Sequence, residues 1–536
     1  MSTPLVTDIA SGNVAQRFLD TVEAFPDAVA LVERVGAGRR AVSYRALLRL
    51  AAGYERAFDR LGVGWGDHVL VLHPPTIGLY AALLALIGRG GVALFVDPGA
   101  PRAVLDVACA RVKPVAFIGA PRAHLLRLVH SGVRRIAHAC TIDGAFVPGA
   151  HRLRADDAAR EAFTPADVGH HHAALVTFTS GSTGVAKGAV RTHGFLHAQR
   201  DALRATIGAA PGSIDLVAFP IVVLLNLTAG VTSVLPRADL SRPARVDPRP
   251  LLAQLDHERV TRCSVPPALL ERLVEASSAA DPCWNTVREV LTGGGPVFPD
   301  LLERARRAAP ATRLRVAYGS TEAEPIAERD ATVDDPGLAA RMRSGEGLPA
   351  GVPVAPVALR VVRATWGEPI PPLSADEFAA RACTVGEAGE IMVTGSHVLT
   401  GYLDGVGDAE TKVHVECSVW HRTGDVGHLD DDGMLWLLGR ASAVERDADG
   451  EVHPFRVECA ARSLWPGIRC AFLVHRSTRV LVIERGDASP DDQAVVAALP
   501  WANIARVMRV GALPVDARHN SKVDYPRLRS QLDRRW

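Results

Sequence analysis

The stretch AALVTFTSGSTGVAKG, residues 173–188, decides how this chain is interpreted. Its first half is an apolar run typical of a buried strand, and it leads directly into a segment rich in glycine and hydroxyl groups. Glycine lets a backbone approach an anion closely, and N–H and hydroxyl groups can donate hydrogen bonds to it. The sequence therefore predicts a phosphate-binding loop made of Thr179, Ser180, Gly181, Ser182, Thr183 and Gly184.

Lys187 follows this loop and is predicted to supply a point charge to the phosphates. The segment does not match the Gly-x-x-x-x-Gly-Lys-Ser/Thr pattern of a Walker A loop. The alternative is a flexible Ser/Gly linker, which is disfavoured because the segment comes straight after a buried strand.

Lysine is rare in this chain. Among its 60 Lys and Arg residues, only Lys113, Lys187, Lys412 and Lys522 are lysine. A lysine retained against such a bias can mark a position that needs a compact ammonium group instead of a planar guanidinium. Chance retention is the alternative for each of them, but Lys187 and Lys522 both fall in motifs.

Composition limits the class of protein. The chain has 536 residues, 48% hydrophobic and 22% charged, which predicts a globular protein of several domains. A formal net charge of +1 gives no sign of a nucleic-acid partner. The first ten residues do not resemble a signal peptide, and the apolar runs are shorter than the ~20 residues that span a membrane, so we expect a cytoplasmic protein without a membrane span.

The order of predicted elements indicates an α/β fold. A helix is expected over Ser43–Asp59 and another over Leu79–Ile87, each followed by an apolar strand, His68–His73 and Gly91–Phe95. Alternating helices and strands predict a parallel sheet. Further strands are expected at 173–178, 215–219, 262–265, 289–292 and 313–317, with a β-rich region after Leu338.

Several motifs, taken together, resemble the adenylate-forming superfamily of acyl-CoA synthetases, luciferases and nonribosomal adenylation domains. Besides the 179–184 loop, they are Gly293-Gly294-Gly295, Tyr318-Gly319-Ser320-Thr321-Glu322, Arg422-Thr423-Gly424-Asp425, Gly439-Arg440 and Lys522. They occur in the family's order, from about residue 20 to residue 530.

This resemblance implies the fold, the cofactors and the role of each residue. It implies an N-terminal adenylation domain (1–439) of doubly wound sheets with a β-rich subdomain, and a small mobile α+β C-terminal domain (440–536). The cofactors would be ATP and Mg²⁺. Glu322 would hold the metal, Thr321 the phosphate and Lys522 the transition state. The nucleotide would contact Gly293, Gly294, Tyr318, Asp425 and Arg440.

The residue types suit these roles. Asp425 can accept two hydroxyl hydrogen bonds, and Glu322 offers the hard oxygen that Mg²⁺ prefers. Tyr318 has a flat face that could stack on adenine. Each also has an ordinary alternative, respectively a turn aspartate, a solvated glutamate and a core aromatic. His170-His171-His172 is not expected to bind a metal, because consecutive side chains diverge.

Two differences from the usual family pattern indicate which branch of the family the chain resembles. Thioester-forming relatives usually carry a lysine and a glycine in the loop after the hinge, whereas residues 439–458 read GRASAVERDADGEVHPFRVE. The tail PVDARHNSK, residues 514–522, is similar to that of the β-lactone synthetases of olefin biosynthesis. In those enzymes the substrate's own β-hydroxyl displaces AMP.

The predicted reaction is therefore adenylation of a small-molecule carboxylic acid with release of pyrophosphate, followed by displacement of AMP to give a β-lactone. The acid is expected to be hydrophobic, with Ile221–Leu227 as a wall of its pocket, unless that run is a core helix. Three alternatives stay open: an acyl-CoA or acyl-carrier ligase, an adenylating synthetase that uses a nitrogen nucleophile, and a nucleotide-binding module without activity.

Overall fold

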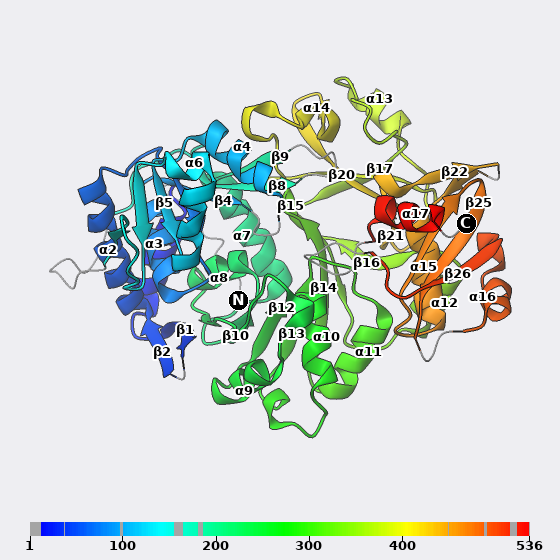
Figure 1. The fold of residues 1–536 in the computed structure, drawn as a ribbon, viewed down its shortest axis with the longest axis horizontal. Helices are drawn as coiled ribbons and strands as arrows, with labels where there is room; N and C mark the ends of the chain where they lie inside the picture. The colour runs from blue at the N-terminus through cyan, green and yellow to red at the C-terminus, as the bar shows by residue number, and fades with distance from the viewer. Residues whose placement is uncertain are drawn as a thin grey trace, which may run out of the picture. The chain divides into compact units, whose positions relative to one another are not determined.

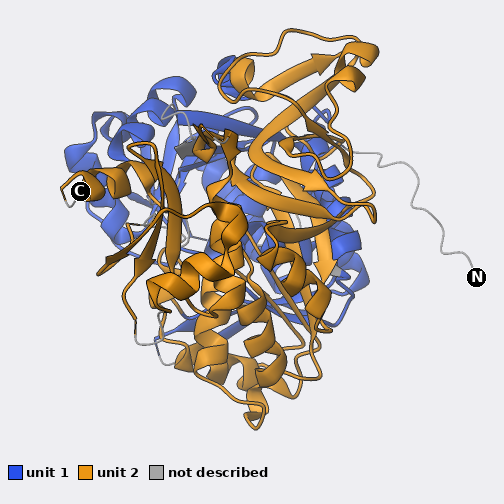
Figure 2. Ribbon diagram, turned by 90° about the vertical axis from the view of Figure 1, so that its right-hand side faces the viewer, with its two compact units in different colours: residues 1–237, 401–407 blue, residues 238–400, 408–536 orange. Residues whose placement is uncertain are grey.

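The computed structural model describes residues 12–36, 38–96, 100–154, 164–180, 186–448, 450–486, 490–514 and 523–534. They form an α/β fold, as predicted (Figure 1). The chain divides into two compact units, coloured separately in Figure 2. Unit 1 consists of residues 1–237 and 401–407, and unit 2 of residues 238–400 and 408–536. The predicted boundary between residues 439 and 440 stays a prediction.

Unit 1 contains two sheets with helices on them. Its strands are β1 (Val29–Val35), β2 (Gly38–Ser43), β3 (His68–Leu72), β4 (Val92–Val96), β5 (Ala116–Gly119), β6 (His138–Thr141), β7 (His151–Arg152), β8 (Ala173–Ser180), β9 (Ala186–Thr192), β10 (Ile214–Val217) and β11 (Thr232–Val234). Its helices are α1 (Ala15–Ala24), α2 (Tyr44–Leu61), α3 (Ile77–Gly88), α4 (Arg102–Val112), α5 (Leu126–Val129), α6 (Ser131–Arg134), α7 (His193–Ile207) and α8 (Pro220–Leu227).

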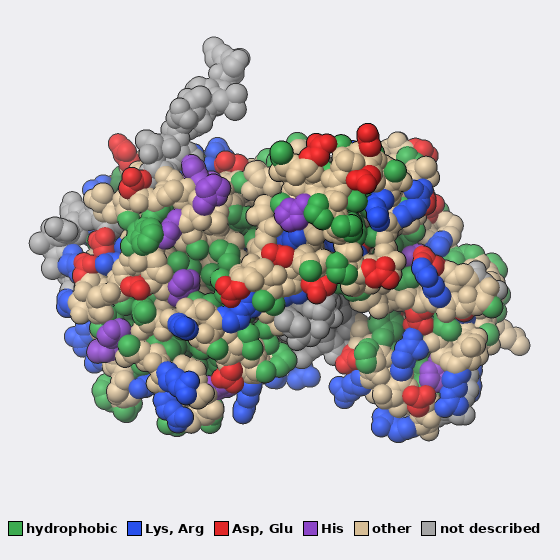
Figure 3. All heavy atoms as spheres, turned by 90° about the horizontal axis from the view of Figure 1, so that it is seen from above, with side chains coloured by type: hydrophobic (Ala, Val, Ile, Leu, Met, Phe, Trp, Pro, Cys, Tyr) green, Lys and Arg blue, Asp and Glu red, His purple; other side chains and the backbone are tan. Residues whose placement is uncertain are grey.

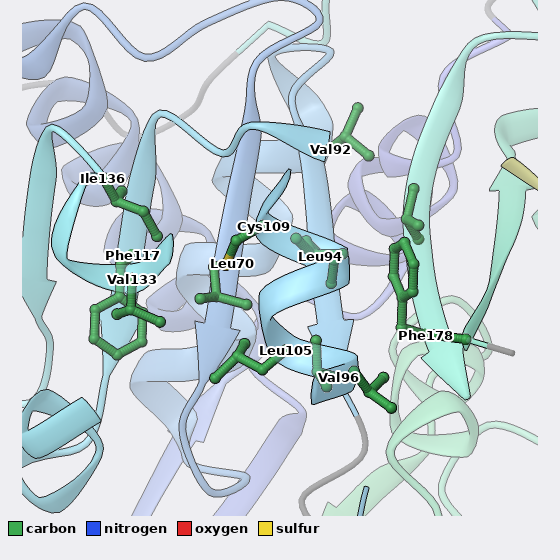
Figure 4. Close-up of a cluster of buried hydrophobic side chains, with 14 residues drawn as sticks. Leu70, Val92, Leu94, Val96, Leu105, Cys109, Phe117, Val133, Ile136 and Phe178 are labelled. Atoms are coloured by element: carbon green, nitrogen blue, oxygen red, sulfur yellow. The ribbon is translucent and has the colours of Figure 1, made fainter. Parts of the chain in front are cut away.

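The larger sheet of unit 1 has the strand order β7-β6-β5-β3-β4-β8-β9. All neighbouring pairs are parallel except β8 and β9, which form an antiparallel hairpin around the predicted phosphate loop. The hydrophobic core of this sheet and α4 is shown in Figure 4, where Leu70, Leu94, Leu105 and Phe178 belong to one cluster of buried side chains. Helix α3 contacts both sheets, and all 12 of its residues are buried, which explains why its sequence is apolar on every face.

Unit 2 contains a long mixed sheet and a smaller three-stranded sheet. Its strands are β12 (Arg262–Val265), β13 (Glu289–Gly293), β14 (Arg313–Ser320), β15 (Ala323–Asp330), β16 (Leu348–Pro353), β17 (Ala358–Val362), β18 (Gly389–Thr394), β19 (Lys412–Val415), β20 (Ser418–Leu429), β21 (Leu435–Arg440), β22 (Glu445–Asp447), β23 (Gly450–Val452), β24 (Cys470–His475), β25 (Thr478–Glu484) and β26 (Arg506–Val510). Its helices are α9 (Arg249–His257), α10 (Pro267–Glu275), α11 (Pro299–Ala308), α12 (Pro336–Arg343), α13 (Ala375–Ala380), α14 (Asp408–Thr411), α15 (Pro454–Leu464), α16 (Asp492–Ala498) and α17 (Tyr525–Asp533).

The mixed sheet places the candidate site. Strands β12, β13 and β14 are parallel, whereas β14, β15, β16 and β21 follow as antiparallel neighbours. Strand β20 pairs with both β21 and β18. The sheet thus joins three parallel strands to an antiparallel region, and Gly293 and Tyr318 lie near the carboxyl ends of the parallel strands β13 and β14.

Helix α15 packs against the middle of the chain. Cys459 shares a buried cluster with Met342, Leu348 and Trp436. Arg462 forms two 3.1 Å contacts with the carboxylate of Asp300 on α11. The segment after Gly439 therefore shares a core with α12 and β21, and it is not an isolated globule in this structure.

The prediction of a loop after the hinge needs correction. Residues 441–450, expected as a loop, include a short helical turn and the hairpin β22–β23. Strands β22 and β23 have three residues each, which is too short for an alternation of apolar and polar residues to be recognised in the sequence. Six of the eight cysteines are buried, whereas Cys417 is exposed and Cys383 is half-buried.

Candidate functional site

Two predicted site regions lie in unit 1, on the hairpin β8–β9. Thr179 and Ser180 end β8 and pair in register with Lys187 and Ala186 on β9. The backbone of this hairpin is therefore continuous up to the predicted phosphate loop. The four loop residues Gly181, Ser182, Thr183 and Gly184, like Lys522, lie outside the residues that the structure describes.

Lys187 is held in a defined position. Its side chain is 4% exposed, and its ammonium lies 5.5 Å from the centre of the Tyr402 ring, within cation–π range. A Cβ added to Gly407, which has φ +98°, would lie 2.6 Å from Cε of Lys187, so only glycine leaves room for the lysine stem. Tyr402 and Gly407 thus fix the charge beside the end of β8.

The other described site residues lie in unit 2. Gly293 ends β13 and pairs with Ala317 on β14. A Cβ on Gly293 would lie 2.4 Å from the carbonyl oxygen of Ala317, so this position also requires glycine. The following Gly294 lines a cavity of about 230 Å³ that is also bordered by Phe298, Phe455 and Ile468.

Thr321 and Glu322 form the turn between β14 and β15. The Glu322 N–H donates to Oγ of Ser320 (3.3 Å), and its carbonyl accepts from the N–H of Leu399 (2.7 Å). This fixes the backbone of the turn from both sides. Glu322 is half-buried, which leaves its side chain within reach of solvent ions.

Asp425 contacts two other predicted site residues, Tyr318 and Arg440. Its Oδ2 accepts a 2.7 Å hydrogen bond from the hydroxyl of Tyr318, and its Oδ1 lies 3.2 Å from Nη1 of Arg440. Asp425 and Arg440 are register partners on β20 and β21. Asp425 raises the pKa of Arg440, and Glu322 contributes in the same direction, so both carboxylates act on this guanidinium.

The hydroxyl of Tyr318 donates its hydrogen bond to Asp425, and its ring packs against the buried hydrophobic cluster that includes Ile326 and Ile391. Burial and the neighbouring Asp425 carboxylate raise its pKa well above the usual range. Tyr318 therefore remains a neutral donor and holds Asp425 in one orientation.

A buried ion pair stabilises β20 three residues before Asp425. Arg422 donates from Nε (3.0 Å) and Nη2 (2.7 Å) to Oε2 of Glu390, and both side chains are at most 2% exposed. Between Arg422 and Asp425, Gly424 adopts φ +70°, and a Cβ there would lie 2.8 Å from the Trp366 ring. The backbone between Arg422 and Asp425 therefore adopts a left-handed conformation at Gly424, where a larger residue would not fit.

Sequence reasoning did not assign roles to Glu390, Trp366 or Tyr402. The available signal was Arg422 itself, because an arginine in a buried strand requires a carboxylate partner. Across the described residues, no group of three or more His, Cys, Asp or Glu side chains could hold a metal ion. The described part of the chain has no helix long and apolar enough to cross a membrane.

Most of the predicted acyl wall proves to be core. In α8, Val222, Val223, Leu225, Asn226 and Leu227 are buried, and only Ile221 and Leu224 among the predicted residues stay half-buried. Asn226 donates 3.1 Å hydrogen bonds to Asp215 and Ser233 in that core. If α8 borders a substrate, it does so through Ile221 and Leu224.

The residues fit the cofactors that were expected. Asp425 has an anchored carboxylate with lone pairs left to accept hydroxyl groups, and Glu322 presents hard oxygen on a fixed turn. Thr292, at the end of β13, has a buried hydroxyl without a partner among the described residues. On the face drawn in Figure 3, acidic and basic side chains are interspersed.

Comparison with known proteins identifies the family. Residues 18–403 match the family described as AMP-binding enzyme. Two relatives are olefin β-lactone synthetases. The protein from Xanthomonas campestris pv. campestris is 33% identical over 87% of this chain and 86% of its own length. The protein from Stenotrophomonas maltophilia is 31% identical over 96% of this chain and 97% of its own length.

Among solved structures, the amide bond synthetase McbA from Marinactinospora thermotolerans superposes with a TM-score of 0.75 at 22% identity, over 97% of this chain and 99% of its own. At that identity the likeness shows the fold alone. The family match and both relatives give the activity class and its cofactors, ATP and Mg²⁺. The chain belongs to the AMP-binding enzyme family and is an ATP-dependent, AMP-forming synthetase.

Proposed function

We propose that this enzyme adenylates a β-hydroxy carboxylic acid and then closes the acyl adenylate to a β-lactone. The observation that carries the proposal is the match to two olefin β-lactone synthetases over 87% and 96% of the chain. The similarity includes the region after Gly439, where the second half-reaction of this family is expected to be determined.

Each predicted site residue has a proposed role in binding the nucleotide or in the transfer step. Asp425 would accept the ribose hydroxyls, held by Tyr318 and Arg440. Lys187 and the 179–184 loop would bind the phosphates, and Thr321 would also contact a phosphate. Gly293 and Gly294 would border the base. Glu322 would hold Mg²⁺, which neutralises charge on the phosphates when it is bound. Lys522 would stabilise the charge that develops as the carboxylate attacks the α-phosphate.

The second step would need no further substrate. The β-hydroxyl attacks the activated carbonyl carbon, the bond from that carbon to the AMP oxygen breaks, and the hydroxyl proton is lost. Because the nucleophile and the carbonyl belong to one molecule, the reaction gains from high effective molarity.

The region after the hinge supports this choice over a CoA ligase. Thioester-forming relatives usually carry a lysine there, whereas this chain has the hairpin β22–β23 with acidic side chains. Asp447 makes a two-pronged ion pair with Arg479, at 2.6 and 2.9 Å, and Glu445 accepts from the N–H of Val474 at 2.7 Å. Through these contacts the two carboxylates hold the hairpin against strands β24 and β25 of the C-terminal sheet.

The test incubates the enzyme with ATP, Mg²⁺ and a panel of β-hydroxy acids, with their 3-deoxy analogues as matched controls. We expect AMP, pyrophosphate and a product that has lost one water from the hydroxy acid, without added CoA. The deoxy acids should stop at the adenylate. A product that forms only when CoA or an amine is added would assign the enzyme to one of the alternative classes.

A further inference from the structure

Lys412 is a rare residue type in an unusual place. It is one of four lysines in the chain, yet no motif of the family includes it. It starts β19, and its side chain is only 4% exposed. Burying an ammonium group is costly unless the surroundings supply hydrogen-bond acceptors. A lysine retained at such a position therefore calls for a reason.

The ammonium of Lys412 bonds to two defined acceptors. It donates to the carbonyl oxygen of Leu399, and it lies 3.1 Å from Nδ1 of His421 on β20. Since an ammonium can only donate, Nδ1 of His421 accepts this contact, and the same Nδ1 also lies 3.3 Å from the carbonyl oxygen of Thr411. Lys412 thus links the neighbouring strand β20 to residue 399.

Residue 399 in turn supports the turn that carries Glu322. Val398 forms an antiparallel bridge with Ala323, and the N–H of Leu399 donates to the carbonyl of Glu322 at 2.7 Å. His397 completes the contact through Nε2, 2.8 Å from the carbonyl of Pro325. Residues 397–399 therefore run along the turn as a short supporting segment.

We infer that Lys412 is a positioning residue for Glu322. Its ammonium fixes the Leu399 peptide, and that peptide fixes the backbone of the turn from which the Glu322 carboxylate projects. The inference rests on the proposed role of Glu322 as the Mg²⁺ ligand. Residues that orient metal ligands typically change metal affinity by about 10- to 100-fold when they are replaced.

An arginine would not serve equally well. A guanidinium is planar and directs its N–H groups in a fixed fork, whereas the ammonium is a compact point with rotatable donors. The two acceptors here, a peptide carbonyl and an imidazole nitrogen, converge on one point in a buried space. This explains a lysine here in a chain whose basic residues are mostly arginine.

The test measures binding instead of turnover. Affinity of the full-length protein for α,β-methylene-ATP is determined by titration calorimetry, with Mg²⁺ and with EDTA. We expect Mg²⁺ to tighten binding by the wild type. Lys412→Met should lose about 10-fold or more of this tightening while its affinity in EDTA stays within about 2-fold. Lys113→Met, which removes an exposed lysine, is the matched control and should behave as wild type.

Two further variants separate the possible failures. Glu322→Gln should abolish the Mg²⁺ effect; if it does not, the assignment of Glu322 is wrong. If Glu322→Gln abolishes the effect but Lys412→Met retains it, the inference about Lys412 is overturned. Equal weakening with Mg²⁺ and with EDTA would also overturn it, because it would show a merely structural role.

Lys412→Arg provides the test if the methionine variant does not fold. It keeps the charge, and we expect it to lose part of the Mg²⁺ effect and to speed hydrogen exchange at the Leu399 amide. A Lys412→Arg protein with the wild-type Mg²⁺ effect and unchanged exchange at Leu399 would contradict the inference.

Discussion

The hydroxyl of Tyr318 on β14 donates a 2.7 Å hydrogen bond to the carboxylate of Asp425 on β20, 107 residues further along the chain. The two motifs that the sequence shows far apart are thus joined by one contact. Because Arg440 holds the other oxygen of the same carboxylate, Asp425 has a single defined orientation.

Asp425→Asn should weaken ATP binding by about 10- to 100-fold, since charge-assisted hydrogen bonds contribute about 1.5–3 kcal/mol each. Calorimetry with ATP and with 2′,3′-dideoxy-ATP locates the loss. The wild type should discriminate against the dideoxy nucleotide, and the variant should not. Tyr318→Phe, which keeps the carboxylate, should cost less than 10-fold. Undiminished discrimination by Asp425→Asn would contradict the ribose assignment.

Lys522→Ala should lower the rate of pyrophosphate release by about 10²–10³ with nearly unchanged ATP affinity, because the lysine is proposed to act in the transition state. Lys522→Arg should not restore the rate, since its fork geometry differs from that of an ammonium. Lys113→Ala serves as the control. Wild-type pyrophosphate release by Lys522→Ala would mean that the tail motif has been misinterpreted.

Arg422→Met should lower the free energy of unfolding by about 3–5 kcal/mol, because it leaves the buried Glu390 carboxylate without its partner. Burial already raises the pKa of Glu390, against the opposing effect of Arg422. The double variant Arg422→Met/Glu390→Met should recover part of the loss, as denaturant unfolding can measure. A single variant as stable as wild type would show that the pair does not support the strand.

Glu458 should make stability depend on pH. Burial raises its pKa from 4.5 to about 7, although it accepts hydrogen bonds from the Tyr525 hydroxyl (2.6 Å) and the Phe472 N–H (2.9 Å). The folded state therefore holds this proton more tightly than the unfolded chain does. Its contribution favours folding below pH 4.5 and is lost as the pH rises to about 7, by roughly 2–3 kcal/mol.

Glu458→Gln keeps an oxygen acceptor and removes this titration. Unfolding free energies measured between pH 4.5 and 8 should fall more steeply for the wild type than for the variant. Identical slopes for the two proteins would exclude Glu458 as the titrating group.

Local sequence patterns predicted the elements of the fold well, and motif order predicted the family. The strand Arg262–Val265 has the expected bounds, and α2 begins one residue after the predicted start, because Ser43 caps it by accepting from the N–H of Ala46. Such signals are local: an apolar period and a capping residue lie within a few positions of each other.

The contacts that position the site were not predictable in this way. Nothing near Glu322 in the sequence indicates that Leu399 and Lys412 support it, because the link passes through backbone atoms of a distant segment. The wall predicted from Ile221–Leu227 was mostly misassigned for a related reason. An apolar run shows that a helix is buried but not whether its cover is protein or substrate.

The packing of α15 also limits how the two halves of the reaction can be separated by protein engineering. Cys459 and Phe455 cover Met342 and Trp436, and Arg462 neutralises Asp300. A chain cut after Gly439 would expose that apolar surface and leave Asp300 with Arg304 alone of its two arginine partners. The inactivity of such a fragment would reflect poor solubility as much as the missing lysine, so point substitution at Lys522 is the cleaner way to silence the enzyme.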